Sequence, residues 1–583
     1  MINFSGARAH KFAESPVLKL CLPAGRSRLI ALSILACFGM LIGRSFYLQV
    51  LNNDFLQEKG ESRYRRDLEI SASRGRISDR NGDVLAVSTP MKSIWAIPAD
   101  ARLSPEQTRR LAGLLEMDVK ELTRRLASDK PFVFLKRQLP PETGDKVAAL
   151  KLPGIGQDRE YRRYYPTGEM TAHIVGFTDV DDKGLEGVEL AFQSQLLGHP
   201  GSRSVIKDRL GQIVEDVGSI RPPRDGRDIR LALDSKIQYV VYSQLKQAVE
   251  DFKATAAGAV VVDARTGEIL ALANWPTYNP NNRERLTGAQ LRNRTLTDTY
   301  EPGSVMKPFT AALALEADKV RFDTVINCAP GRMAIGAATI SDAHPHGPLT
   351  VAQIIQKSSN IGMAKIAAML SPEQMWRMYE AIGLGQPPGL GFPGEVAGRL
   401  RPWKTWRPIE QATMSYGHGL SVSLMQLARA YTVFAREGDI IPLTLTRSDG
   451  TPARSAQVFS QQTAREMRAM LEMAAQPGGT APKAQVPGYR VAGKTGTAYK
   501  VEGGQYVRKY VASFVGFAPV SDPRLVVAVM IDEPKSGAHY GGDVAGPVFS
   551  RVMGGALRVL GVVPDAPAMQ TAAAQNGRTE KAL

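Results

Sequence analysis

The stretch AGAVVVDARTGEILALAN (residues 257–274) contains two apolar runs separated by the dipeptide Thr266-Gly267. Short apolar runs on either side of a glycine-containing turn are typical of a β-hairpin. Just upstream, residues 235–252 carry apolar side chains at helical spacing. A helix followed by a hairpin therefore opens a folded domain that begins near residue 228.

Three further strand-like runs lie far downstream, at 489–500, 510–520 and 524–534, and a helical stripe follows at 547–560. The region between the two groups of strands reads as helices and loops. We expect an α+β fold in which one antiparallel sheet is built from both ends of the domain, with the helical region inserted between them. This domain spans 228–562, and the Ala-, Pro- and Gln-rich tail at 563–583 is predicted to be disordered.

Residues 51–227 form a separate, charged and irregular region. A chain of 583 residues is too long for a single core, so a second folded unit is expected here. Asn81-Gly82, between short apolar runs, predicts a hairpin. The turn-forming pairs Pro222-Pro223 and Asp225-Gly226 mark the boundary with the next domain.

An apolar segment at 29–50 predicts a transmembrane helix. Its first part, LIALSILACFGMLIG (29–43), carries no charge, and roughly 20 apolar residues span a bilayer. Arg44 lies toward one end, where its side chain can reach the lipid headgroups. The tail at 1–28 is basic, so the positive-inside rule places it in the cytoplasm and the rest of the chain on the periplasmic side of the inner membrane.

Two alternatives to an uncleaved anchor are a cleaved signal peptide and lipoprotein processing at Cys37. No small-x-small cleavage site follows the apolar run, and the run continues past Cys37. An uncleaved anchor is the favoured interpretation.

The net charge of +16 suits an anionic membrane, a carboxylate-rich polymer or nucleic acid. The basic residues are spread along the chain without a nucleic-acid-binding module, so no nucleic-acid partner is expected. Of the three cysteines, Cys21, Cys37 and Cys328, one lies beyond the apolar segment, which argues against a disulfide or a cysteine-based metal site there. His344 and His346 favour an exposed His-Pro-His loop over a metal site.

Three short motifs follow one another in the second domain. Ser304 and Lys307 form S-x-x-K, Ser358 and Asn360 form S-x-N, and Lys494 begins K-T-G. In this order, the motifs predict a serine acyl-transfer site.

Local context separates these motifs from chance matches. Ser204 begins another S-x-x-K, but it lies in a strand-like run, where residues three apart point to opposite faces. Ser304 follows Glu301-Pro302-Gly303 and precedes an apolar helical run, so Ser304 and Lys307 are expected on one helix face. Lys535, in a near-match to K-T-G, lies in a turn.

The motif residues suit nucleophilic catalysis. A serine needs a base, and a lysine can serve only when neutral, which requires burial or a second cation such as Lys494 to lower the pKa of Lys307. The backbone N–H groups of Ser304 and Thr497 are candidates for the oxyanion hole. Ser358, in a turn between two helical runs, is placed to relay a proton to the leaving group.

EPGSVMKP (301–308), KSSN (357–360) and KTGTAYK (494–500) resemble the penicilloyl-serine transferases, in particular the division-type class B penicillin-binding proteins of the FtsI family. The resemblance covers nearly the whole chain and extends to 74–86, 161–177 and 184–190, which are similar to that family's non-catalytic, dimerisation-type pedestal. Val305 departs from the threonine expected there in many relatives.

The resemblance implies that Ser304 is the nucleophile and Lys307 its base. It also implies that Ser358, Asn360 and Lys494 complete the proton network and hold the stem peptide. Thr495, Gly496 and Thr497 would form the substrate-binding strand, with the two threonines facing the substrate carboxylate.

The expected function is septal peptidoglycan D,D-transpeptidation, with β-lactams as covalent inhibitors and an FtsW-type glycosyltransferase and other division proteins as partners. An elongation-type transpeptidase and a non-catalytic β-lactam sensor or scaffold are the alternatives. A class A β-lactamase would carry an E-x-x-L-N pattern after S-x-N, and Glu373, Glu380 and Glu395 lack it. We expect no cofactor and no metal.

Overall fold

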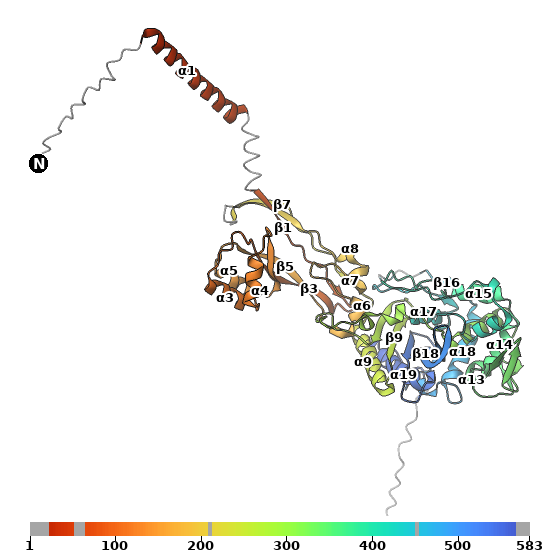
Figure 1. Ribbon diagram of the computed structural model, residues 1–583. Coiled ribbons are helices and arrows are strands. Elements are labelled where there is room, and N and C mark those ends of the chain that lie inside the picture. The colour runs from red at the N-terminus through yellow and green to blue at the C-terminus, as the bar shows by residue number, and fades with distance from the viewer. Residues whose placement is uncertain (1–22, 52–64, 208–212, 449, 451–453, 567–583) are drawn as a thin grey trace, which may run out of the picture.

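The computed structural model describes residues 23–51, 65–207, 213–448, 450 and 454–566 (Figure 1). The predicted disordered tail, apart from 563–566, and most of the predicted cytoplasmic tail lie outside these ranges.

The N-terminal apolar segment is helical and long enough to cross a membrane. Helix α1 (Ala24–Phe46) continues into a π-helical turn (Tyr47–Leu51), and none of the α1 side chains is buried. The helix therefore begins before the predicted residue 29 and includes Arg26 and Arg28. The basic side chains do not oppose helix formation, and the break comes only at Pro23.

The pedestal region is elongated and built around two sheets (Figure 1). One has the order β1-β6-β7, and in the other β4-β3-β2-β8 follow one another while β5 also pairs with β3. The strands are β1 (Arg65–Ile70), β2 (Ile77–Ser78), β3 (Val84–Ala96), β4 (Val133–Leu139), β5 (Ile155–Tyr164), β6 (Gly201–Lys207), β7 (Ile213–Arg221) and β8 (Ile229–Arg230). The hairpin predicted at Asn81-Gly82 is confirmed, because Ser78 of β2 pairs with Val84 of β3.

Short helices complete the pedestal. Three of them pack around the β3–β4–β5 sheet, and three connect β5 to β6 (Figure 1). They are α3 (Pro105–Leu114), α4 (Val119–Leu126), α5 (Pro141–Ala149), α6 (Ala172–Val175), α7 (Gly187–Ala191) and α8 (Gln193–Leu196).

A buried ion network ties the pedestal together. Arg74 Nε and Arg163 Nε each donate to Glu189 at 2.6 Å, and all three side chains are almost completely buried. The two guanidinium groups also donate to backbone carbonyls, Arg74 to Asp182 and Arg163 to Gly75. Buried charges are tolerated only when they are paired and hydrogen-bonded, as these are.

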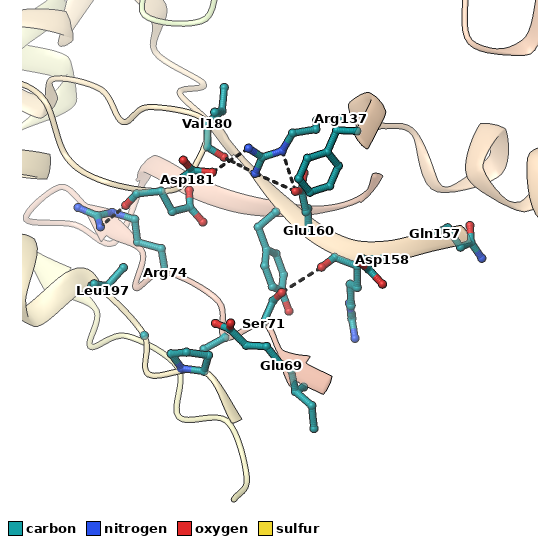
Figure 2. Close-up of a pocket in the computed structure, with 18 of the residues that line it drawn as sticks. Glu69, Ser71, Arg74, Arg137, Gln157, Asp158, Glu160, Val180, Asp181 and Leu197 are labelled. Atoms are coloured by element: carbon teal, nitrogen blue, oxygen red, sulfur yellow. Dashed lines mark hydrogen bonds and ion pairs between the residues drawn. The ribbon is translucent and has the colours of Figure 1, made fainter. Parts of the chain in front are cut away.

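The pedestal also contains a cavity of about 730 Å³ between its two sheets. Figure 2 shows Arg137 reaching from β4 across to Glu160 and Asp181, both at 2.8 Å. The cavity lies within the pedestal and includes none of the motif residues.

The second domain has the predicted antiparallel sheet, in the order β10-β9-β19-β18-β17. Its strands come from both ends of the domain, which confirms the sequence interpretation: β9 (Ala256–Asp263), β10 (Ile269–Trp275), β17 (Ala492–Glu502), β18 (Gln505–Ala518) and β19 (Leu525–Asp532). Helices α9 (Ser235–Phe252) and α19 (Gly541–Val559) pack on one face, and α17 (Leu424–Ala435) packs on the other. The central strands are therefore buried on both sides, which explains their unbroken apolar runs.

The helical region lies between β10 and β17 in sequence, as predicted, and β17 is an edge strand. Its helices are α10 (Gly288–Leu291), α11 (Arg294–Thr297), α12 (Lys307–Glu316), α13 (Val351–Lys357), α14 (Asn360–Ala367), α15 (Pro372–Ala381), α16 (Pro408–Met414), α17 and α18 (Gln461–Ala475). Short strand pairs also belong to this region: β11 (Val325–Asn327) with β14 (Pro348–Thr350), β12 (Arg332–Ile335) with β13 (Ala338–Ser341), and β15 (Asp439–Ile440) with β16 (Ala456–Gln457).

Candidate active site

Ser304 lies in a 3₁₀ turn (Gly303–Met306) that leads directly into α12. The turn is held by Tyr431 of α17, whose hydroxyl donates to the Val305 carbonyl at 2.7 Å. The turn is also packed closely against Gly417, where an added Cβ would lie 2.1 Å from the Gly303 carbonyl oxygen. Ser304 remains partly exposed, and within the described ranges its hydroxyl has no hydrogen-bond partner.

Lys307 is completely buried at the start of α12. Its Nζ donates to Ser358 Oγ at 2.9 Å and also to the Ser358 carbonyl. Burial lowers the pKa of Lys307 well below its usual value, and the nearby Lys494 lowers it further, while Asp342 opposes the shift. The sequence predicted that Ser304 and Lys307 share a helix face, and the side-chain hydrogen bonds of Lys307 go to Ser358.

The S-x-N motif occupies the junction between α13 and α14. Ser358 ends α13 in a left-handed conformation with φ of +63°, and Ser359 caps α14 by accepting from the Gly362 N–H. The left-handed residue turns the chain between the two helices, as the sequence predicted. Asn360 begins α14 and donates through Nδ2 to the Ser341 carbonyl at 2.9 Å.

Asp342 holds this junction in place, and sequence reasoning missed it. Its carboxylate accepts from Ser359 Oγ at 2.7 Å, from the Asn360 N–H at 2.5 Å and from the Ile361 N–H at 3.0 Å. The negative charge of Asp342 also raises the pKa of Lys307. A lone aspartate in a polar loop gives no signal of this role in the sequence.

Lys494 lies on the edge strand β17 and is also completely buried. Its Nζ donates to Thr495 Oγ1 at 3.1 Å and to Thr480 Oγ1 at 3.4 Å. Thr495 Oγ1 donates in turn to Thr480 Oγ1 at 3.1 Å, so Thr480 is a second residue that the motif search missed. Burial lowers the pKa of Lys494 to about 7.

Gly496 and Thr497 bring β17 against the turn that carries Ser304. A Cβ at Gly496 would lie 2.6 Å from the Pro302 carbonyl oxygen, so a side chain there would push the strand away. Thr497 Oγ1 accepts from the Gly541 N–H at the start of α19, at 2.9 Å. The Thr497 hydroxyl is therefore held by α19, and the predicted contact of this side chain with a substrate carboxylate remains a prediction.

The competing motif matches lie elsewhere. Ser204 is buried in strand β6 of the pedestal, where it pairs with Asp67 of β1, and Lys535 lies in the loop after β19. His344 is exposed in a loop, and within the described ranges no three His, Cys, Asp or Glu side chains form a potential metal site. The site consequently combines the partly exposed hydroxyl of Ser304, the two buried lysines and the Ser358 hydroxyl, which is hydrogen-bonded to Lys307.

Family models match most of the chain. Residues 257–554 match the model described as penicillin binding protein transpeptidase domain, and residues 69–231 match the penicillin-binding protein dimerisation domain. The first match contains all three motifs.

Similar proteins match over almost their full length. The chain is 44% identical over 560 residues to the probable peptidoglycan D,D-transpeptidase PenA of Neisseria gonorrhoeae, covering 95% of this chain and 96% of that protein. It is 41% identical over 549 residues to the peptidoglycan D,D-transpeptidase FtsI of Escherichia coli (strain K12), covering 93% of each.

Solved structures show the same architecture. The TP domain of Burkholderia pseudomallei penicillin-binding protein 3 is 55% identical with a TM-score of 0.54, covering 58% of this chain and 98% of that one. A peptidoglycan synthetase from Bifidobacterium adolescentis is 25% identical with a TM-score of 0.70, covering 86% of this chain and 98% of that one.

Proposed function

The chain belongs to the class B penicillin-binding proteins, with a dimerisation and a transpeptidase domain, and is a peptidoglycan D,D-transpeptidase; on that premise we propose that Ser304 forms its acyl-enzyme. The observation that carries this proposal is the buried Lys307, hydrogen-bonded to Ser358 and lying one helical turn from Ser304. Burial favours the neutral amine that a base requires.

In the first half-reaction, Ser304 Oγ attacks the carbonyl carbon of the penultimate D-Ala of a stem peptide, and its proton passes to Lys307 Nζ. The backbone N–H groups of Ser304 and Thr497 would stabilise the oxyanion. When the tetrahedral intermediate collapses, the bond to the terminal D-Ala breaks, and Ser358 relays the proton from Lys307 to the leaving amine. The support for the relay is the 2.9 Å Lys307–Ser358 hydrogen bond.

In the second half-reaction, an acceptor amine from another stem attacks the acyl-enzyme. The amine loses its proton through Ser358 and Lys307, and Ser304 Oγ leaves with that proton, so the enzyme returns to its starting state. Water in place of the amine would give carboxypeptidase activity. β-Lactams would acylate Ser304 in the same way, but the amine freed by ring opening would stay attached to the acyl group.

Lys494 and Asn360 would hold the donor peptide, and Thr495, Gly496 and Thr497 would line it along β17. The two lysines have different surroundings. Burial and the charge of Lys494 both lower the pKa of Lys307, and Asp342 raises it. The pKa of Lys494 is lowered by burial alone. Lys494 is thus the better candidate for the cation that docks the substrate carboxylate.

We further propose that this activity serves the division septum, with an FtsW-type glycosyltransferase as partner. The basis is the similarity to FtsI and the helix α1, which would anchor residues 29–50 in the inner membrane with 1–28 in the cytoplasm and both domains, 51–227 and 228–562, in the periplasm. An elongation role is the second candidate, because the PenA relatives do not specify the stage of growth.

Two measurements test these proposals. Purified full-length protein should release D-Ala from a pentapeptide donor and form cross-linked dimers with an added acceptor, and mass spectrometry should find the trapped acyl group on Ser304. Depletion of the protein in its own host should give filaments if it acts at the septum. Rounded cells that still divide would instead assign it to elongation.

A further inference from the structure

A groove of about 450 Å³ lies beside the edge strand β17. One side comes from the chain just before Ser304 and another from β17 itself beyond Thr497. Its charged lining residues are Glu301, Arg399, Arg401 and Lys500. A strand rises about 3.3 Å per residue, so Tyr499 to Val501 lie roughly 7–13 Å beyond Thr497. A peptide lying along β17 from Ser304 would therefore reach this groove.

The acidic residue in the groove, Glu301, is already hydrogen-bonded within the protein. Glu301 accepts from the Gly419 N–H at 2.8 Å and from Tyr506 Oη at 2.9 Å, and it lies 3.0 Å from His418 Nδ1. These three partners saturate the carboxylate, which fixes the loop before Ser304. Glu301 is consequently a structural clamp and offers little to a ligand.

Two of the three basic residues in the groove, Arg401 and Lys500, already form ion pairs. Arg401 is paired with Glu410 at 2.8 Å. Lys500 lies 2.7 Å from Glu533 and 3.0 Å from Asp532, and these carboxylates raise its pKa although burial opposes them.

The third basic residue, Arg399, has a fixed backbone and an exposed side chain. Its backbone is fixed by two hydrogen bonds with Ser421, from the Arg399 N–H at 2.8 Å and from the Ser421 N–H at 3.0 Å. The preceding Gly398 is packed so closely that a Cβ would lie 2.2 Å from the Ser421 carbonyl oxygen. Its guanidinium, by contrast, is exposed and has neither an ion pair nor a hydrogen bond among the described residues. The groove thus presents one uncommitted cation on a rigid support.

We propose that this groove is a subsite for a carboxylate on the stem peptide, upstream of the residue that acylates Ser304, and that Arg399 binds it. The planar guanidinium fork matches a carboxylate in a bidentate contact. Leu420, Val501 and Val511 supply an apolar wall for the aliphatic part of such a residue. The inference rests on the proposed function, since it assigns the stem carboxylate a binding partner.

The test compares two pentapeptide donors that differ only in one upstream group, a free carboxylate or its carboxamide. Full-length wild-type protein in detergent should turn over the carboxylate peptide with about a fivefold higher kcat/KM, as a partly exposed Arg–carboxylate contact allows. Arg399→Ala should lose this preference, Arg399→Glu should reverse it, and Arg399→Lys should restore part of it. Arg551→Ala, which removes an exposed positive charge on α19, is the matched control and should behave as wild type.

Acylation by a penicillin without an upstream carboxylate provides a second readout. Its second-order rate constant should change less than about twofold in Arg399→Ala, because a ligand without the carboxylate gains nothing from Arg399. An unchanged carboxylate preference in Arg399→Ala, with wild-type turnover intact, would overturn the subsite and leave the proposed function standing. A wild-type protein that turns over neither peptide would overturn both.

Discussion

Lys307 Nζ lies 2.9 Å from Ser358 Oγ, although the two residues are 51 positions apart in the chain. The contact joins the start of α12 to the turn between α13 and α14. The contact holds the proposed base, Lys307, against the Ser358 hydroxyl, and Ser304 precedes Lys307 by three residues in the turn that leads into α12. A lysine in this position can accept a proton from one and return it through the other.

Ser304→Ala is expected to abolish covalent labelling by fluorescent penicillin, because the variant lacks the proposed nucleophile. Ser204→Ala should leave labelling intact, since Ser204 is buried in a pedestal strand. Gel fluorescence and mass-spectrometric mapping of the modified peptide would check both. Loss of the adduct in the Ser204 variant alone would show that the wrong S-x-x-K motif has been assigned.

Lys494→Ala is expected to slow penicillin acylation and to move its onset to higher pH. The Lys494 ammonium lowers the pKa of Lys307, so its removal raises that pKa and the neutral base appears only at higher pH. The acylation rate of the wild type should also fall above about pH 7, because neutral Lys494 no longer docks the penicillin carboxylate. The variant should lack this fall.

The measurement is the second-order acylation rate constant as a function of pH. Lys494→Arg keeps the charge without the compact ammonium and should rescue only part of the rate. A uniform loss with an unchanged profile would leave Lys494 as a binding residue and remove it from proton transfer.

Asp342→Asn should shift the acylation profile the other way. The Asp342 carboxylate raises the pKa of Lys307, so neutralising it lowers that pKa and moves the onset of activity to lower pH. The asparagine can still accept from the Asn360 and Ile361 N–H groups, so the fold should hold. Asp342→Ala removes these acceptors and should also cost about 1–3 kcal/mol of stability.

Asp323→Asn, on an exposed loop, is the matched control for charge and should leave the profile in place. Acylation rates between pH 4 and 9 and the free energy of unfolding would be measured for each variant. A profile that moves to higher pH in Asp342→Asn would contradict the assigned sign.

Glu189→Gln should destabilise the pedestal strongly. It removes the carboxylate that two buried guanidinium groups share, and an uncompensated buried charge costs about 3–5 kcal/mol. The pedestal transition in thermal unfolding should move to lower temperature while penicillin acylation of folded protein is retained. Glu250→Gln, on the exposed side of α9, should be close to neutral, and an equal effect of both variants would argue against the network.

Several structural elements could be predicted from the sequence because their hydrogen bonds are local. The helix at 235–252, the hairpin at Thr266-Gly267 and the turn at Asn81-Gly82 all follow from periodicity and turn chemistry. Helical context also separated Ser304 from Ser204, since it depends only on neighbouring residues. Helix α1 begins before the predicted span of 29–50, because basic residues are as compatible with a helix as apolar ones and the apolar pattern marks only the part that would face a membrane.

By itself, then, the sequence determined the α+β architecture, the order of the three motifs and the family to which the chain belongs. Only the tertiary structure decided that Lys307 bonds to Ser358, that Asp342 and Thr480 support the motifs, and that the Arg399 guanidinium faces a groove with no ion pair to the described part of the chain. The physical reason is the range of the interactions. Local patterns encode hydrogen bonds within a helix or hairpin, whereas the burial and pairing of a charged side chain depend on segments that packing brings together from distant parts of the chain.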